Sequence, residues 1–234
     1  MRHYLILYAV AALLSPQPGR AQPAPVVLEL FTSQGCSSCP PADAILAELS
    51  QAEGVIALAL HVDYWDYLGW PDGFADRKFT DRQRAYAKAA RSRTIFTPEM
   101  VVQGSERLKG HDAAGIRDRI AAHRQREAPV GLSIAPDGDA LRIRLAPGEG
   151  APGPMDVQVA RFVPHEVVSI EAGENAGQTI AYTNIVTGWE TIGHWDGLAP
   201  AELRYAEAGQ GPLAVIVQES RMGPVVNAAL WPQP

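Results

Sequence analysis

The chain has 234 residues, of which 47% are hydrophobic, so it is long enough for two small domains and apolar enough for a packed core. This composition excludes a largely disordered chain. The formal net charge is −6, with both signs mixed along the chain, so we expect no surface for a polyanion and no nucleic acid partner.

The first 21 residues have the pattern of a signal peptide. A short basic start, Arg2 and His3, precedes the apolar run 4–14, which is too short to span a bilayer as a helix. Small residues end the segment, and we expect cleavage after Ala21. No later stretch is apolar enough to cross a membrane, so we expect a periplasmic or secreted bacterial protein without stable membrane insertion.

Residues 22–128 have the pattern of an α/β domain. The β-branched and apolar run Val26–Phe31 predicts a buried strand. The elements expected after it are a helix over 43–51, a strand over 55–62, a helix over 76–91, strands over 99–103 and 107–109, and a helix over 112–126. A strand, a helix and a strand so close together form a βαβ unit, so the first two strands are expected to be parallel.

Residues 129–234 have the pattern of an all-β, sandwich-like domain. Short alternating runs are separated by Gly, Pro and Asp, and no helix is expected. The strands expected are 130–135, 140–145, 156–162, 167–170, 179–187, 203–206, 213–218 and 225–230. Clusters such as Gly173-Glu174-Asn175 are typical of turns.

The only two cysteines of the chain, Cys36 and Cys39, lie three residues apart. A disulfide between them closes too small a loop to stabilise the fold much, which favours a reactive role. They follow the first strand, at the edge of the sheet where α/β proteins bind ligands, and they precede a helix whose N-terminus favours a thiolate. We therefore expect Cys36 to be the exposed attacking thiol and Cys39 the buried resolving thiol.

Two prolines follow the cysteine pair directly. The residue before a proline avoids helical geometry, and prolines lack the N–H groups of a normal first turn. We therefore expect the helix to begin only at Pro40 or Pro41, which places the cysteine pair on a looser turn.

Two features together resemble the thioredoxin superfamily over about residues 26–126. One is the Cys36-Ser37-Ser38-Cys39 motif after a strand, and the other is Thr97-Pro98 before a hairpin that contains Gly104 and Gly110. The longer box TSQGCSSCPPAD, residues 32–43, is similar to an uncharacterised family of exported bacterial proteins, the domain of unknown function DUF1223. The fold that the resemblance implies is a thioredoxin-like α/β domain followed by an all-β domain.

The resemblance also implies roles for individual residues. Cys36 matches the nucleophile and Cys39 the resolving thiol of the superfamily, and their disulfide is the only redox group expected. Pro98 matches a cis-proline, preceded by Thr97, whose backbone pairs with the substrate chain. Glu29 falls near a buried carboxylate that takes the proton from Cys39, although a solvent-facing or salt-bridged strand residue is an equal alternative.

The segment after the second strand contains several aromatic residues. Tyr64 and Trp65 form either a surface for an extended peptide or a plug that covers the sheet edge. His61 is a proton donor, a metal ligand or a core histidine with satisfied hydrogen bonds, and we favour the last.

Three functions are compatible with these residues. We expect first an exported oxidoreductase that acts on protein thiols or disulfides together with an unidentified redox partner. The second is a copper(I) carrier in which Cys36 and Cys39, with His61, bind the metal, because soft thiolates suit this ion. The third is a redox-inert, partner-binding protein, which a buried Cys36 without an open groove would support.

Overall fold

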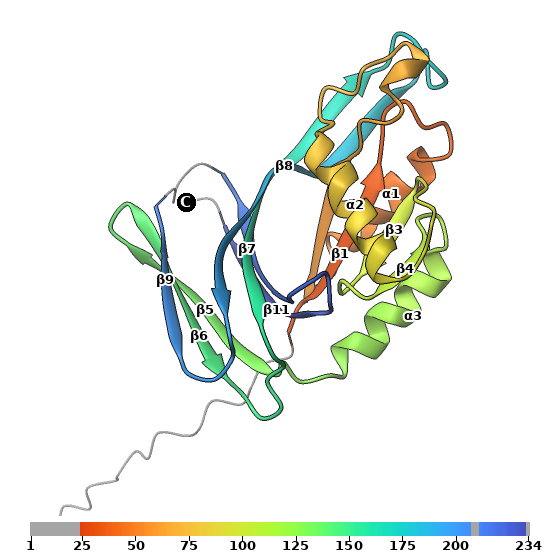
Figure 1. The fold of residues 1–234 in the computed structure, drawn as a ribbon. Helices are drawn as coiled ribbons and strands as arrows, with labels where there is room; N and C mark the ends of the chain where they lie inside the picture. Colours follow the sequence, from red (N-terminus) through yellow and green to blue (C-terminus); the bar gives the residue numbers. More distant parts are fainter. Residues whose placement is uncertain (1–23, 207–210, 233–234) are drawn as a thin grey trace, which may run out of the picture.

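The computed structural model describes residues 24–206 and 211–232, so the predicted signal peptide lies outside the described residues. The chain forms a mixed α/β fold with one large mixed sheet and a second, small sheet (Figure 1). In chain order the elements are β1 (Val26–Thr32), α1 (Pro40–Leu49), β2 (Val55–His61), the 3-10 helix η1 (Asp66–Leu68), α2 (Arg77–Ala89), β3 (Glu99–Val102), β4 (Glu106–Lys109), α3 (Ala113–Arg124), β5 (Val130–Asp137), β6 (Ala140–Pro147), β7 (Met155–Ser169), β8 (Thr179–Trp195), β9 (Ala201–Tyr205), β10 (Leu213–Glu219) and β11 (Val225–Trp231).

The large sheet has eight strands in the order β11-β10-β7-β8-β2-β1-β3-β4. As predicted, β1 and β2 are parallel, and they pair from Val26 opposite Val55 to Thr32 opposite His61. The other neighbour of β1 is β3, which is antiparallel. The boundary expected near residue 128 falls between α3 and β5, but the large sheet contains strands from both sides of that boundary.

The helices cover both faces of the β1–β4 half of this sheet. Leu46 of α1 and Ile116 of α3 pack with Leu28 in one hydrophobic cluster. Phe79 of α2 packs with Phe31 on the opposite face, in a cluster that also includes residues of β10 and β11. Because alternate residues of a strand point to opposite faces, both faces of β1 are buried and all seven of its residues are inaccessible.

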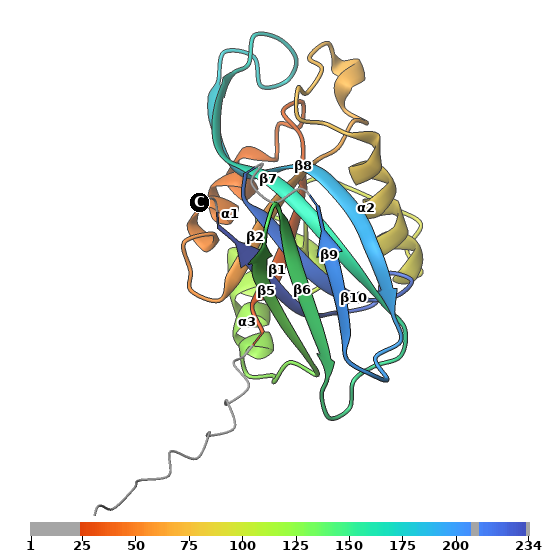
Figure 2. The ribbon, with the colours of Figure 1, turned by 90° about the vertical axis from the view of Figure 1, so that its left-hand side faces the viewer.

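The small sheet has the order β5-β6-β9 and covers the other half of the large sheet (Figure 2). Leu141 and Ile143 of β6 pack in one cluster with Val157 of β7 and Val215 of β10. This arrangement is sandwich-like, and the hairpin predicted at 136–139 joins β5 to β6.

The strands β7 and β8 form one long hairpin rather than the separate short strands expected. Their pairing extends from Met155 opposite Trp195 to Ser169 opposite Thr179, with two register shifts. The tip of the hairpin reaches past the end of the sandwich and lies beside the helical half of the molecule (Figure 1). Within the described ranges, no helix has the length and apolarity needed to cross a bilayer.

A buried arginine joins elements from both halves of the chain. Arg82 of α2 donates two hydrogen bonds to the Glu29 carboxylate, at 2.6 and 2.9 Å, and further bonds to Gln158 of β7 and Gln218 of β10. Its guanidinium also lies 3.8 Å from the centroid of the Trp189 ring. Since Glu29 is fully buried, its charge depends on this partner.

We expect Arg82→Met to lower the free energy of unfolding by about 3 to 5 kcal/mol, because it leaves the Glu29 charge buried and unpaired. Urea unfolding followed by circular dichroism measures this loss. The matched control is Arg84→Met, on the same helix, where the exposed pair with Asp81 should contribute little. Equal losses in the two variants would contradict this account of the buried pair.

Candidate functional site

Cys36 and Cys39 form a disulfide directly after β1, with their Cα atoms 5.4 Å apart. Cys39 is the N-cap of α1, and its carbonyl accepts hydrogen bonds from the backbone N–H groups of Ala42 and Asp43, at 2.8 and 3.1 Å. The helix begins at Pro40, as predicted from the double proline. Cys36 therefore lies on the turn before the helix.

The prediction that Cys36 is exposed is wrong for this state of the protein. Its exposed fraction is 1%, and that of Cys39 is 0%. Neither cysteine belongs to any of the four hydrophobic clusters formed by the described residues. Ser37 and Ser38, which lie between the two cysteines, are exposed, so little protein covers the disulfide.

The loop between β7 and β8, residues 170–178, is hydrogen-bonded to the cysteine motif. The Asn175 side-chain amide donates hydrogen bonds to the backbone carbonyls of Gln34, at 2.8 Å, and Cys36, at 3.0 Å. The Ser37 hydroxyl donates a hydrogen bond of 2.7 Å to the Glu174 carboxylate. These residues had been expected only to form a turn, and the contact spans 139 positions between Cys36 and Asn175.

The Thr97–Pro98 peptide bond is cis, as predicted. Gly110 lies between Pro98 and Ala42, a residue in the first turn of α1. If Gly110 carried a Cβ, that atom would lie 2.8 Å from the Cβ of Pro98 and 3.0 Å from the Cβ of Ala42. The structure therefore places this proline beside α1, whose N-cap is Cys39.

Trp65 connects the two segments that flank the site. Its indole N–H donates a hydrogen bond of 2.7 Å to the Thr97 hydroxyl. Trp65 also packs closely against Gly35, because a Cβ added to Gly35 would lie 3.1 Å from the Cβ of Trp65. Tyr64 turns instead toward α2, where its hydroxyl donates to Gln83 at 3.3 Å, and burial raises the pKa of Tyr64 to about 12. Both aromatic residues are half-buried.

The placement expected for Glu29 beside Cys39 is wrong, and the salt-bridged alternative is confirmed. Its side chain is on the α2 face of the sheet, paired with Arg82 and accepting a 2.6 Å hydrogen bond from Tyr86. Helix α1, whose N-cap is Cys39, packs on the other face. The sheet therefore separates Glu29 from the resolving cysteine.

A different carboxylate, which is not among the predicted site residues, is buried on the cysteine side. Asp43 lies one helical turn after Cys39, and its two oxygens form no hydrogen bond among the described residues. Burial raises the pKa of Asp43 to about 7, opposed by the nearby charge of His61 and the hydroxyl of Thr32. The spacing of four residues after Cys39 is the signal that identifies it.

His61 is buried, and only one of its two ring nitrogens has a hydrogen-bond partner among the described residues. Its Nδ1 lies 2.7 Å from the Asp72 Oδ2, and the rings of Phe74 and Tyr182 pack edge-on against it, with centroids at 5.2 and 5.0 Å. The Nε2 atom has no hydrogen-bond partner among the described residues. The prediction of a satisfied core histidine is therefore confirmed for one ring nitrogen and not for the other.

The copper alternative requires free thiolates, and the disulfide leaves none in this state. Among residues 24–206 and 211–232, no three His, Cys, Asp or Glu side chains are arranged to hold a metal ion.

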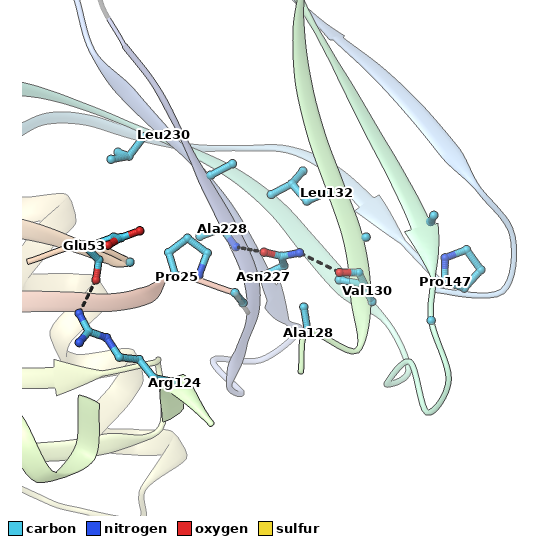
Figure 3. A pocket seen from close by; sticks show the side chains of 16 residues that line it. Pro25, Glu53, Arg124, Ala128, Val130, Leu132, Pro147, Asn227, Ala228 and Leu230 are labelled. Carbon is cyan, nitrogen blue, oxygen red and sulfur yellow. Dashed lines mark hydrogen bonds between the residues drawn. The ribbon is translucent and has the colours of Figure 1, made fainter. Parts of the chain in front are cut away.

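A cavity of about 1070 Å³ lies at the opposite end of β1 from the cysteines (Figure 3). Its lining includes Pro25, Val130 and Leu132, together with Arg124, which donates a hydrogen bond to the Glu53 backbone carbonyl. Because seven strand residues separate its Pro25 side from the end of β1, roughly 20 Å of sheet lies between this cavity and the disulfide.

Comparison with known proteins places the chain among structures of similar architecture. The crystal structure of protein AGR_C_4864 from Agrobacterium tumefaciens is 34% identical, with a TM-score of 0.79, over 92% of this chain and 97% of that chain. HBP35 of Porphyromonas gingivalis is 15% identical, with a TM-score of 0.64, over 91% of this chain and 76% of that chain, and this likeness shows the fold alone. No curated protein matches the chain.

The family model described as "Protein of unknown function (DUF1223)" matches residues 27–218. This match covers most of the chain and includes the cysteine motif, the segment of Thr97 and Pro98, and the β7–β8 hairpin. The chain therefore belongs to the DUF1223 family.

Proposed function

We propose that this protein is an exported thiol-disulfide oxidoreductase whose Cys36–Cys39 pair cycles between dithiol and disulfide. Its substrates are protein thiols or disulfides, and a second redox protein restores the pair. The observation that carries the proposal is a disulfide between neighbouring cysteines at the carboxyl edge of two parallel strands. Such a bond closes a loop too short to stabilise the fold appreciably, which favours a role in chemistry.

The arrangement around the cysteine pair supports a thioredoxin-like fold for the first half of the chain. The elements β1 to α3 follow the order βαβαββα, with α1 and α3 on one face of the strands and α2 on the other. The cysteine motif is at the β1–α1 junction, and Pro98 is beside the first turn of α1. This is the relation between motif and proline that the resemblance implies.

In the state that the structure describes, which we call the closed state, a protein substrate cannot reach the disulfide, since Cys36 is 1% exposed. Exchange requires a thiolate to approach one sulfur of the disulfide. The proposed function therefore includes opening of the loop 170–178, which is held over Cys36 by the Asn175 amide. Most of this loop is exposed, so its opening is a local event rather than an unfolding of the core.

The burial of Cys36 also favours a second candidate function, a redox-inert protein that binds a partner. In that case the disulfide would be a permanent part of the structure and the loop would stay closed. Redox titration separates the two candidates.

Thiol trapping after equilibration in glutathione or dithiothreitol buffers should reveal one transition between disulfide and dithiol. Cys39→Ser should abolish the transition, because it removes the resolving thiol. A wild-type pair that stays oxidised at every accessible potential, also in the Asn175→Ala variant, would favour the redox-inert candidate.

Asn175→Ala should speed the reduction of the disulfide by a phosphine roughly fivefold to hundredfold, because the lost buried hydrogen bonds make opening easier by about 1 to 3 kcal/mol. The matched control is Asn227→Ala, which removes an amide bond of 2.8 Å to the Val130 carbonyl beside the distant cavity. The rate of phosphine reduction, followed by mass spectrometry, checks the prediction. An unchanged rate for Asn175→Ala, or an equal gain for Asn227→Ala, would show that this side chain does not hold the site closed.

A further inference from the structure

A cluster of buried polar side chains lies on the face of the sheet that α1 covers, next to the disulfide. Thr32 and His61 are paired at the carboxyl ends of β1 and β2. Because alternate residues of a strand point to opposite faces, both lie on the face that α1 covers. Asp43 is on the buried side of α1, which packs on this same face. All three residues are at least nine-tenths buried.

Four polar atoms of this cluster form no hydrogen bond of normal geometry among the described residues, although the Thr32 hydroxyl lies near enough to Asp43 to lower its pKa. They are both carboxyl oxygens of Asp43, the Thr32 hydroxyl oxygen and the Nε2 atom of His61. A buried polar atom without a partner costs about 1 to 3 kcal/mol, so such a concentration indicates a group that acts in chemistry rather than in stability.

Asp43 is placed to exchange a proton with Cys39. Both belong to the same helical turn, since the Asp43 N–H donates to the Cys39 carbonyl at 3.1 Å. Side chains of a helix lean toward its N-terminus, so the Asp43 carboxyl leans over the turn that holds Cys39. The thiol of Cys39 is fully buried, so its proton needs an internal acceptor.

His61 is placed to accept the proton next. The carboxylate of Asp72 accepts hydrogen bonds from the backbone N–H groups of Gln34 and Phe74, at 2.8 and 2.9 Å, and lies 2.7 Å from His61 Nδ1. An anion held by these donors fixes the Nδ1–H tautomer and leaves the Nε2 lone pair free. It also stabilises the imidazolium that forms when Nε2 takes a proton.

We propose that Asp43 accepts the thiol proton of Cys39 and passes it to His61, and that Asp72 stabilises the charged imidazole. This inference rests on the proposed oxidoreductase function. Asp43 is the group that meets the reacting thiol, whereas His61 and Asp72 act through it.

The Asp43 carboxylate takes the proton of the Cys39 thiol, and the Cys39 thiolate attacks the Cys36 sulfur of a mixed disulfide with a substrate protein. The bond between Cys36 and Cys39 forms, and the bond between Cys36 and the substrate sulfur breaks. The substrate sulfur leaves with the electron pair as a thiolate, so two electrons pass from the two cysteines to the substrate disulfide.

The groups facing the cluster come from four elements of the fold. They are Asp43 from α1, His61 from β2, Asp72 from the segment after η1 and Tyr182 from β8, whose pKa is raised by burial and by the Asp43 and Asp72 charges. Burial brings the pKa of Asp43 to about 7, within the range where a general base acts at neutral pH. The charge of His61 after Nε2 has taken the proton lowers the pKa of Asp43, so the removal of His61 should raise it further.

A pH-jump experiment on the full chain measures the proton step alone. The reduced protein is incubated with excess dithiobis(nitrobenzoate) at about pH 4, where the small thiolate fraction of Cys36 forms the mixed disulfide slowly and Cys39 stays protonated. After a jump to higher pH, the attack of Cys39 releases thionitrobenzoate in one intramolecular step. For the wild type, the rate of release should rise with pH and level off near pH 7, as Asp43 ionises.

Asp43→Asn should slow this release at pH 7 by at least about tenfold, and its rate should keep rising to higher pH, because Cys39 must then lose its proton to solvent. His61→Asn keeps a donor for Asp72 but carries no proton, and it should move the plateau to higher pH. The matched controls are Asp118→Asn on the exposed face of α3 and His194→Asn, which changes an exposed histidine paired with Asp156 at 2.8 Å. Both controls should keep the wild-type profile.

The outcomes separate this inference from the function on which it rests. A mixed disulfide that never forms, also in the Asn175→Ala variant, would overturn the oxidoreductase function. A mixed disulfide that forms but releases thionitrobenzoate with the same pH profile in wild type, Asp43→Asn and His61→Asn would overturn only the proton relay. If Asp43→Asn does not fold, the proton relay is still tested by the other two proteins. A wild-type rate without a plateau near pH 7, or a plateau that does not shift in His61→Asn, would overturn it.

Discussion

Asn175 donates both hydrogens of its side-chain amide to backbone carbonyls beside the cysteine pair, those of Gln34 and Cys36. This contact joins the loop between β7 and β8, in the second half of the chain, to the cysteine motif in the first half. It lies next to a disulfide that retains almost no accessible area, although the two serines between its cysteines are exposed. Every functional interpretation of the site therefore depends on how easily this contact opens.

The same contact depends on the architecture of the large sheet. The hairpin of β7 and β8 belongs to the sandwich at one end, where Val157 is part of the shared core, and reaches the cysteine motif at the other. Arg82 fixes the two halves together on the opposite face through Glu29 and Gln218. The second half of the chain thus supplies the support for the cover over Cys36, which gives the β-rich half a role in the proposed chemistry.

Local patterns predicted the elements of the first half and the start of α1, because strand and helix periodicity and the effect of proline are properties of neighbouring residues. They did not predict the face of Glu29. All residues of β1 are buried, so the alternation that normally separates inner from outer residues is absent. The strands expected over 156–162 and 167–170 leave a gap at 163–166, whereas the ladder of β7 continues through it.

The site was predicted in part for a similar reason. The cysteine pair, Thr97 and Pro98 stand out as motifs, but the contacts of Asn175 and Asp72 join residues that are 139 and 11 positions from their partners Cys36 and His61. No local pattern marks such pairs. Asp43 is different, because its place one turn after Cys39 can be read from the helix spacing alone.

In the proposed function, a redox-active disulfide lies beside a loop that opens without unfolding of the protein. The rate of phosphine reduction of the wild-type disulfide, measured at increasing urea concentrations below the unfolding transition, tests it most directly. Local opening exposes little surface, so the account predicts a rate that is nearly independent of urea. A rate that rises with the same urea dependence as global unfolding would contradict the account, because the disulfide would then react only in the unfolded chain.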